Sequence, residues 1–152
     1  MSQNLKEESL SQEMQASSAT RANDYSGDVS HFDERIRRAL HAAAEKKALA
    51  PTVLDLRDIA TFTDYFVIVT GTNRRQVQAI SDEVVEQLKR AGTRAARVEG
   101  YQTAEWILVD YGDFIVHVFD DKARRFFDLE RLWREAKRVD ITAEPTGSLR
   151  TE

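Results

Sequence analysis

Two short apolar runs, separated by residues that favour a turn, constrain the fold of this chain more than any other feature of its sequence. The runs are residues 106–109 and 114–119, and Tyr111, Gly112 and Asp113 lie between them. β-Branched and aromatic residues favour strands, and a Gly-Asp pair allows the chain to reverse direction within a few residues. The pattern therefore predicts a tight β-hairpin.

The hairpin region also carries aromatic and acidic side chains that an aliphatic core does not need. These side chains are Tyr101, Glu105, Trp106, Asp110 and Asp113. Successive strand residues face opposite sides of a sheet, so Trp106, Leu108 and Asp110 are expected to share the face opposite Ile107 and Val109. A carboxylate beside Trp106 favours a solvated, partner-binding face, because Trp and Tyr are enriched at interfaces. A Trp that fills the core remains the alternative.

Hydrophobic periodicity and capping residues predict the other elements. The first helix is expected at residues 31–49, with Ser30 as its N-cap and Pro51 ending it. A second helix is expected after the Asn73 cap, with Gly92 at its end. Strands are expected at residues 52–56, 65–70 and 94–99, and a last helix at residues 121–138. The last helix offers several apolar side chains for burial: Phe126 or Phe127, Leu129, Leu132, Trp133 and Ala136.

The order of elements is α-β-β-α-β-β-β-α. It predicts an α/β (α+β) fold with a mixed sheet of about five strands flanked by helices. The unbroken apolar run at residues 65–69 indicates a strand that is buried on both faces. A strand, a helix and another strand in sequence also favour a right-handed crossover.

The folded domain is expected at residues 30–139, between two acidic tails. Residues 1–29 and 140–152 hold few large apolar side chains, so both are expected to be disordered. The domain holds 19 basic and 18 acidic groups, and this balance gives no large field for gripping nucleic acid. Basic pairs such as Arg37-Arg38 are scattered with acids between them, which favours solvated helix faces over an RNA surface.

Composition also bears on location. The chain has no Cys, which excludes a disulfide framework and a thiolate zinc site. Its first residues include Glu7, Glu8 and Glu13 and no apolar stretch, unlike a signal or transit peptide. Its apolar runs are too short to span a bilayer. We expect the protein in the cytoplasm.

A turn at Gly71, Thr72 and Asn73 is the first candidate for chemistry, because amides at a helix N-terminus favour anions. Arg74 and Arg75 follow and would assist a phosphate, or lie on a solvated face. The turn lacks the lysine of a P-loop and the three glycines of a dinucleotide fingerprint. An ordinary strand-to-helix turn is favoured, and nucleotide binding remains the alternative.

Metal and nucleophilic chemistry have weaker signals. Asp110 and Asp113 are three residues apart across a turn, so they do not form the paired carboxylates of a nucleotidyl-transfer site. His117 lies among aliphatic strand residues, where a hydrogen-bonded core or interface histidine is favoured over a metal ligand. No nucleophile-and-base motif is found.

The residues resemble the ribosomal silencing factor family, also called the Iojap family, from about Ile36 to Trp133. The matching segments, in chain order, are Leu54-Asp55-Leu56, Thr63-Asp64-Tyr65-Phe66-Val67-Ile68, Thr70-Gly71-Thr72-Asn73-Arg74-Arg75-Gln76-Val77, Glu99-Gly100, Trp106-Ile107-Leu108-Val109-Asp110, Gly112-Asp113, Val116-His117-Val118-Phe119 and Leu129-Glu130-Arg131-Leu132-Trp133. The tails lie outside this pattern.

This resemblance implies a nucleotidyltransferase-like fold without catalysis, and therefore no catalytic residue, metal or cofactor. It implies binding to the large ribosomal subunit through its ribosomal protein number fourteen, which blocks subunit joining and represses translation when nutrients are scarce. It also implies a possible homodimer. The contact residues expected from it are Trp106, Asp110, Tyr101, Glu105, Asp113 and Gly112 of the hairpin region, followed by Asn73 and Arg74. A nucleotide-binding enzyme and an RNA-binding protein remain the alternatives.

Overall fold

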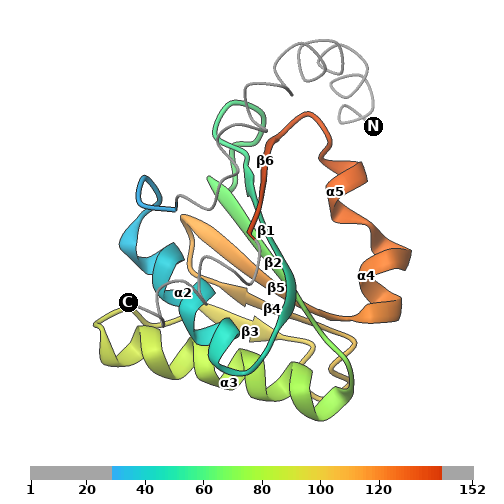
Figure 1. The fold of residues 1–152 in the computed structure, drawn as a ribbon. Helices are drawn as coiled ribbons and strands as arrows, with labels where there is room; N and C mark the ends of the chain where they lie inside the picture. The colour runs from blue at the N-terminus through green and yellow to red at the C-terminus, as the bar shows by residue number, and fades with distance from the viewer. Residues whose placement is uncertain (1–28, 142–152) are drawn as a thin grey trace.

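A computed structural model describes residues 29–141 as one mixed sheet with helices on both faces (Figure 1). The strand order is β3-β4-β5-β2-β1-β6. The elements along the chain are α2 (Glu34–Glu45), β1 (Leu49–Asp55), β2 (Tyr65–Gly71), α3 (Arg74–Arg90), β3 (Arg97–Glu99), β4 (Trp106–Asp110), β5 (Phe114–Asp120), α4 (Asp121–Phe127), α5 (Leu129–Leu132) and β6 (Lys137–Asp140). The predicted fold class is confirmed, with a sixth strand in addition to the expected five.

The centre of the sheet is the parallel pair β2 and β5, and the other neighbours pair antiparallel. In the parallel pair, Tyr65 lies beside Phe114 and Gly71 beside Asp120. All of β5 except Asp120 is buried, and so is all of β2 except Tyr65. Parallel strands need cover on both faces, which explains why these two segments read as unbroken apolar runs.

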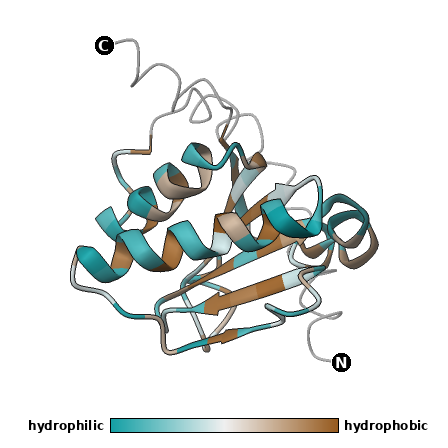
Figure 2. Cartoon of the chain, turned by 90° about the horizontal axis from the view of Figure 1, so that it is seen from below, coloured by the Kyte–Doolittle hydropathy of each residue, from teal (hydrophilic) through white to brown (hydrophobic). Residues whose placement is uncertain are grey.

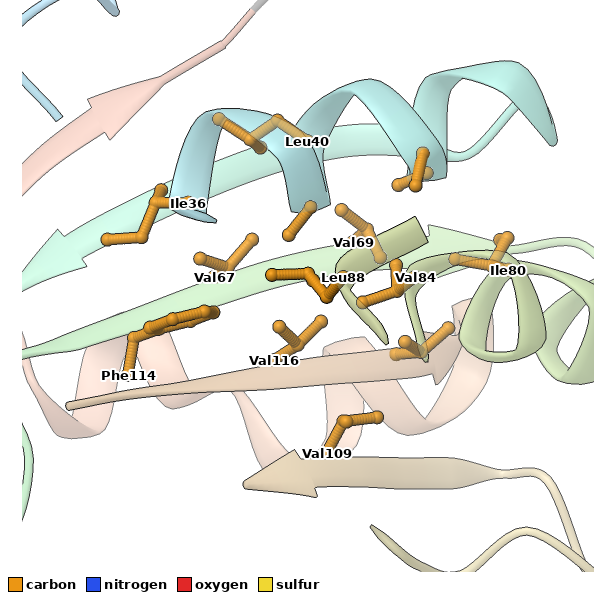
Figure 3. Packing of buried hydrophobic residues seen from close by; sticks show 14 of the residues in the cluster. Ile36, Leu40, Val67, Val69, Ile80, Val84, Leu88, Val109, Phe114 and Val116 are labelled. Carbon is orange, nitrogen blue, oxygen red and sulfur yellow. The ribbon is translucent and has the colours of Figure 1, made fainter. Parts of the chain in front are cut away.

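The long helices α2 and α3 close one face of the sheet. Ile36 of α2, with Val84 and Leu88 of α3, lies against Val67 and neighbouring residues of the strands (Figure 3). In Figure 2 the central strands are largely brown and the helix turns change between teal and brown, as expected for helices with one apolar side.

The N- and C-termini of α3 follow the expected capping chemistry. The Asn73 side chain accepts a hydrogen bond from the backbone N–H of Gln76 at 2.8 Å. Gly92 has a φ of 101°, the left-handed conformation that glycine adopts at low cost after a helix. The predicted hairpin is also confirmed, because β4 and β5 are antiparallel and residues 111–113 connect them.

The expected bounds of the first helix were wrong. It begins at Glu34, where Asp33 rather than Ser30 caps it by accepting a hydrogen bond from the Arg35 N–H at 2.7 Å. It ends at Glu45, and Lys47 then turns left-handed with a φ of 64°. Pro51 does not end a helix but lies inside β1, where the register shifts between Leu49 and Thr52. A proline is tolerated at such an irregularity, where one ladder hydrogen bond is missing.

The expected last helix, residues 121–138, was also wrong. Asp128 is left-handed with a φ of 48°, which separates α4 from α5, and its side chain caps α5. The chain then forms β6, which pairs antiparallel with β1. Three of the four residues of β6 are charged, so their pattern is that of a solvated helix end. The segment forms a strand because it pairs with β1, and the local sequence does not reveal that pairing.

The C-terminal boundary of the domain therefore lies beyond residue 139. Asp140 belongs to β6 and accepts a hydrogen bond from the Thr52 hydroxyl at 3.0 Å. Ile141 is buried in the core between the sheet and helices α2 and α3, which we call the first core. Apart from residue 29 and residues 140 and 141, the two tails predicted to be disordered lie outside the described residues.

Candidate partner-binding surface

The second face of the sheet is covered by α4 and α5, which lie across the sheet from α2 and α3 (Figure 1). These helices have 7 and 4 residues, against 12 and 17 for α2 and α3. Helix α4 packs on β5 and β2, and Leu108 and Asp110 of β4 stay half-buried. The second face is therefore only partly closed.

Aromatic rings in mutual contact run across this second face. We call them the aromatic band: Phe62, Phe66, Trp106, His117, Phe119, Phe126, Phe127 and Trp133. The middle of the band is buried, but its ends are open, since Phe62 is 55% exposed, Phe127 44% and Phe126 79%. Exposed aromatic side chains that continue a buried cluster are typical of an interaction surface.

Trp106 sits where the band reaches the open part of the face. Its ring centroid lies 4.9 Å from that of Phe119 and 4.7 Å from that of Phe127. Its indole Nε1–H donates a hydrogen bond to Nδ1 of His117 at 3.0 Å. Ile107 and Val109 point into the opposite core, so the alternation predicted for β4 is confirmed. Trp106 is half-buried, so it is neither a fully buried core residue nor a fully exposed one.

His117 is buried inside the band, with 3% of its surface exposed. Its ring meets that of Phe66 edge-on at 4.4 Å. Burial without a charged partner lowers the pKa of His117 to about 3, so the ring is neutral at physiological pH and Nδ1 is free to accept from Trp106. The interpretation of His117 as a hydrogen-bonded core histidine is confirmed. Within residues 29–141, no group of three or more His, Cys, Asp or Glu side chains is arranged to hold a metal ion.

Asp110 shares the face of Trp106, as expected, but its carboxylate is already engaged. One oxygen accepts from Nε of Arg97 at 3.2 Å, and the other accepts from the Gly112 backbone N–H at 2.8 Å. Arg97 also pairs with Glu99 at 3.0 Å. A short strip of paired charges on β3 and β4 thus borders the aromatic band.

The structure separates the remaining predicted contact residues. Tyr101 packs against the first core, and its hydroxyl donates to Asp82 of α3 at 3.1 Å. Asp113, at the β4–β5 turn, pairs with Arg35 of α2 at 3.0 Å. The carbonyl of Gly112 accepts from the Thr63 hydroxyl at 2.8 Å. Only Glu105 lies next to Trp106, and it is exposed.

Asn73 and Arg74 lie at the edge of the sheet where β2 and β5 end. Gly71 pairs with Asp120, whose N–H donates to the Glu105 carbonyl at 2.9 Å, so this edge also holds the start of β4. Asn73 is occupied as the cap of α3, and Arg74 is exposed in its first turn.

The turn from residue 71 to 73 has its own structural explanation. The side-chain oxygen of Gln76 accepts from the backbone N–H and the hydroxyl of Thr72 at 2.6 and 2.9 Å. The side-chain amide nitrogen of Gln76 donates to the backbone carbonyls of Lys46 and Lys47. A Cβ on Gly71 would lie 3.0 Å from a methyl of Val77. The glycine therefore allows α3 to pack closely, and the side chains of Asn73 and Gln76 take the amides that a phosphate would use.

Sequence reasoning missed the exposure of the band's ends. Either Phe126 or Phe127, together with Leu132, was expected to be available for burial, yet all three are exposed. One signal was present: adjacent residues on a helix point about 100° apart, so a Phe-Phe pair in a short helix cannot bury both rings against one sheet. The exposure of Phe62 had no such signal.

A solved structure has a similar fold. The crystal structure of a Chromobacterium violaceum protein has a TM-score of 0.65 at 34% sequence identity, and the match covers 66% of this chain and 83% of that chain. The protein is therefore a mixed α/β domain of that fold.

The family described as ribosomal silencing factor during starvation matches residues 29–151. A ribosomal silencing factor of Halalkalibacterium halodurans is 37% identical over 108 residues, which is 71% of this chain and 92% of the relative. One from Bacillus subtilis is 38% identical over 106 residues, 70% and 90% of the two chains. The chain belongs to the ribosomal silencing factor family. None of its described helices is both long and apolar enough to cross a membrane.

Proposed function

We propose that this protein binds the large ribosomal subunit through its ribosomal protein number fourteen and thereby blocks association with the small subunit. The bound domain fills part of the space between the subunits, so joining requires its dissociation and translation falls when nutrients are scarce. The mechanism is steric, and needs no catalysis, metal or cofactor. It acts in the cytoplasm.

The observation that carries this proposal is the partly open second face, where Trp106 and Leu108 are half-buried beside exposed Phe126 and Phe127. The family description supplies the ribosome as the partner. The aromatic band offers apolar area to bury, and the exposed carboxylate of Glu105 borders it next to Trp106. Such a mixture suits a partner with apolar and basic side chains, as ribosomal proteins have.

The residues predicted to make contact divide into two groups. Trp106, Asp110 and Glu105 belong to the proposed interface, and Asn73 and Arg74 border it at the end of the sheet. Tyr101 and Asp113 are expected to support the hairpin from the α3 and α2 side, and Gly112 through Thr63 of the β1–β2 connection. Asp110 acts by ordering Arg97, which then offers its remaining donors at the border of the interface.

The same open face is a natural surface for a homodimer of the free protein. If the dimer buries Trp106 and Phe126, dimerisation and ribosome binding compete. Excess ribosomal partner is then expected to convert the dimer to a one-to-one complex, as measured by light scattering. A dimer that persists in the complex would reject the competition.

The test is subunit joining in a sucrose gradient with purified subunits. Wild-type protein is expected to reduce joined ribosomes, and Trp106→Ala is expected to restore them. The matched control is Tyr101→Ala, which removes an aromatic ring from the other side of the sheet. Unchanged joining with the wild type overturns the function. Equal inhibition by wild type and Trp106→Ala overturns the proposed interface, provided that circular dichroism shows the variant to be folded.

A further inference from the structure

We infer that His117 is a positioning residue: by accepting the indole N–H of Trp106, it holds that ring so that the partner meets only its carbon atoms. The inference rests on the proposed function, because it concerns the chemistry of the same surface. His117 itself is buried, with 3% of its surface exposed, so it acts through Trp106.

The geometry restricts Trp106 from two sides. The hydrogen bond to His117 Nδ1, at 3.0 Å, joins neighbouring strands of the sheet, since Leu108 of β4 pairs with His117 of β5. The Phe119 and Phe127 rings lie 4.9 and 4.7 Å from the indole ring. A half-exposed tryptophan usually directs its N–H to water or to a partner's acceptor. Here the N–H points into the protein instead.

The surroundings of His117 explain how it can accept this bond. The rings of Phe66, Trp106 and Phe119 contact it, and the residue is buried among them. Nδ1 accepts, so the proton of the neutral ring is on Nε2. Nε2 has no hydrogen-bond partner within the described part of the chain. Leaving a buried polar atom unpaired costs free energy, so the histidine has a stability cost that a leucine would not have. A function in orienting Trp106 accounts for that cost.

The partner's chemistry follows from this orientation. A partner that offered a carbonyl oxygen to Trp106 would find no free donor, whereas an aliphatic side chain or the methylene stem of a Lys or Arg would pack well on the ring. We therefore expect the partner to contact Trp106 through apolar atoms, with its polar contacts at the Arg97, Glu99 and Asp110 strip.

The first measurement uses the full chain and does not need the ribosome. In a ¹H–¹⁵N spectrum, the indole N–H of Trp106 is expected to exchange slowly with water, and His117→Leu is expected to shift its signal and make exchange faster. Trp133 is the internal control, since no bond joins it to His117. His117→Asn places an oxygen near the position of Nδ1 and is expected to restore part of the shift. A Trp106 signal that does not respond to His117→Leu overturns the inference.

The second measurement is a double-mutant cycle of binding to large subunits by co-sedimentation. His117→Leu is expected to weaken binding by about three- to tenfold, the range of one hydrogen bond, but to have no further effect in the Trp106→Phe background. An equal loss in both backgrounds would indicate a merely structural role and overturn the inference. A wild-type protein that shows the spectral signature but does not bind subunits contradicts the proposed function. It also contradicts the expected apolar contact of the partner with Trp106. The hydrogen bond between Trp106 and His117 would still be supported.

Discussion

The two faces of the sheet are covered by different sets of side chains. The face under α2 and α3 is mostly aliphatic, with residues such as Ile80, Val84 and Leu88 fully buried. The face under α4 and α5 carries the aromatic band beside aliphatic residues, and it is only partly closed. Aliphatic side chains pack without polar groups, whereas Trp and His bring N–H groups and acceptors that need partners. We therefore expect stability to be concentrated on the first face, and we propose recognition on the second.

The lengths of the covering helices explain part of the difference in how far the two faces are closed. A helix of 17 residues, such as α3, spans about 25 Å at 1.5 Å per residue and crosses several strands. Helix α4, with 7 residues, spans about 10 Å and leaves β4 half-covered. The band therefore ends in exposed rings.

The largest effect is expected from deleting a buried side chain on the first face. Leu88→Ala is expected to lower the free energy of unfolding by about 3–4 kcal/mol, because it leaves a cavity among residues that cannot collapse into it. Leu132→Ala, on the exposed end of α5, is the matched control and is expected to cost less than about 1 kcal/mol. Urea denaturation measures both. Equal losses would break the comparison between the faces.

The next effect concerns Arg124, which ties α4 and α5 to the sheet. Its guanidinium donates to Glu130 of α5, to the Ala50 carbonyl at 2.7 Å, and to the hydroxyls of Thr70 and Thr52 at 2.8 and 3.1 Å. Arg124→Met leaves the Glu130 carboxylate, whose side chain is only 10% exposed, without its partner, and is expected to cost about 3 kcal/mol.

The control for Arg124 is Arg125→Met. Arg125 pairs with Asp121 on the exposed side of α4, and exposed pairs contribute about 0–1 kcal/mol. Thermal unfolding of the two variants is the measurement. If the exposed arginine matters as much as the buried one, α4 and α5 are not held by the Arg124 network.

A pH effect is expected from His117. Its pKa is lowered to about 3 in the folded protein, against about 6.5 when unfolded, so the unfolded chain binds more protons between these values. Stability from this residue is therefore complete above pH 6.5 and is lost as pH falls, by about tenfold in the folding equilibrium constant per pH unit. Urea midpoints from pH 7 to pH 4.5 measure it. His117→Leu is expected to flatten this slope; an unchanged slope would contradict the neutral, buried state.

The smallest effect is expected for nucleotides. The amides at the start of α3 are bonded to Asn73 and Gln76, so calorimetry with millimolar nucleotide and magnesium is expected to show no saturable heat. Gln76→Ala, which frees the Thr72 N–H, serves as the comparison. Saturable binding by the wild type would revive the nucleotide alternative and move the functional site from the aromatic face to the edge of the sheet.

Much of the fold could be predicted because its signals are local. The buried strand at β2, the Asn73 cap, Gly92 and the hairpin each depend on a few neighbouring residues. Strand β6 could not, because four residues, three of them charged, become a strand only by pairing with β1. The break at Asp128 likewise needs a left-handed residue that is not glycine.

The residues of the candidate site likewise divide into those that a local pattern predicts and those that depend on contacts distant in sequence. Alternation along β4 was enough to put Trp106 and Asp110 on one face. The positions of Tyr101 and Asp113 depend on Asp82 of α3 and Arg35 of α2, which are distant in sequence. The His117 acceptor was equally hidden, because cross-strand pairs such as Leu108 with His117 are set by register.

The most direct test is hydroxyl-radical footprinting of the protein with and without large ribosomal subunits. Labelling of Phe126, Phe127 and Trp106 is expected to fall on binding, while labelling of Tyr101, on the α3 side, is expected to stay the same. Protection of Tyr101 with Phe126, Phe127 and Trp106 still labelled would contradict the account, because the ribosome would then meet the face that we assign to stability.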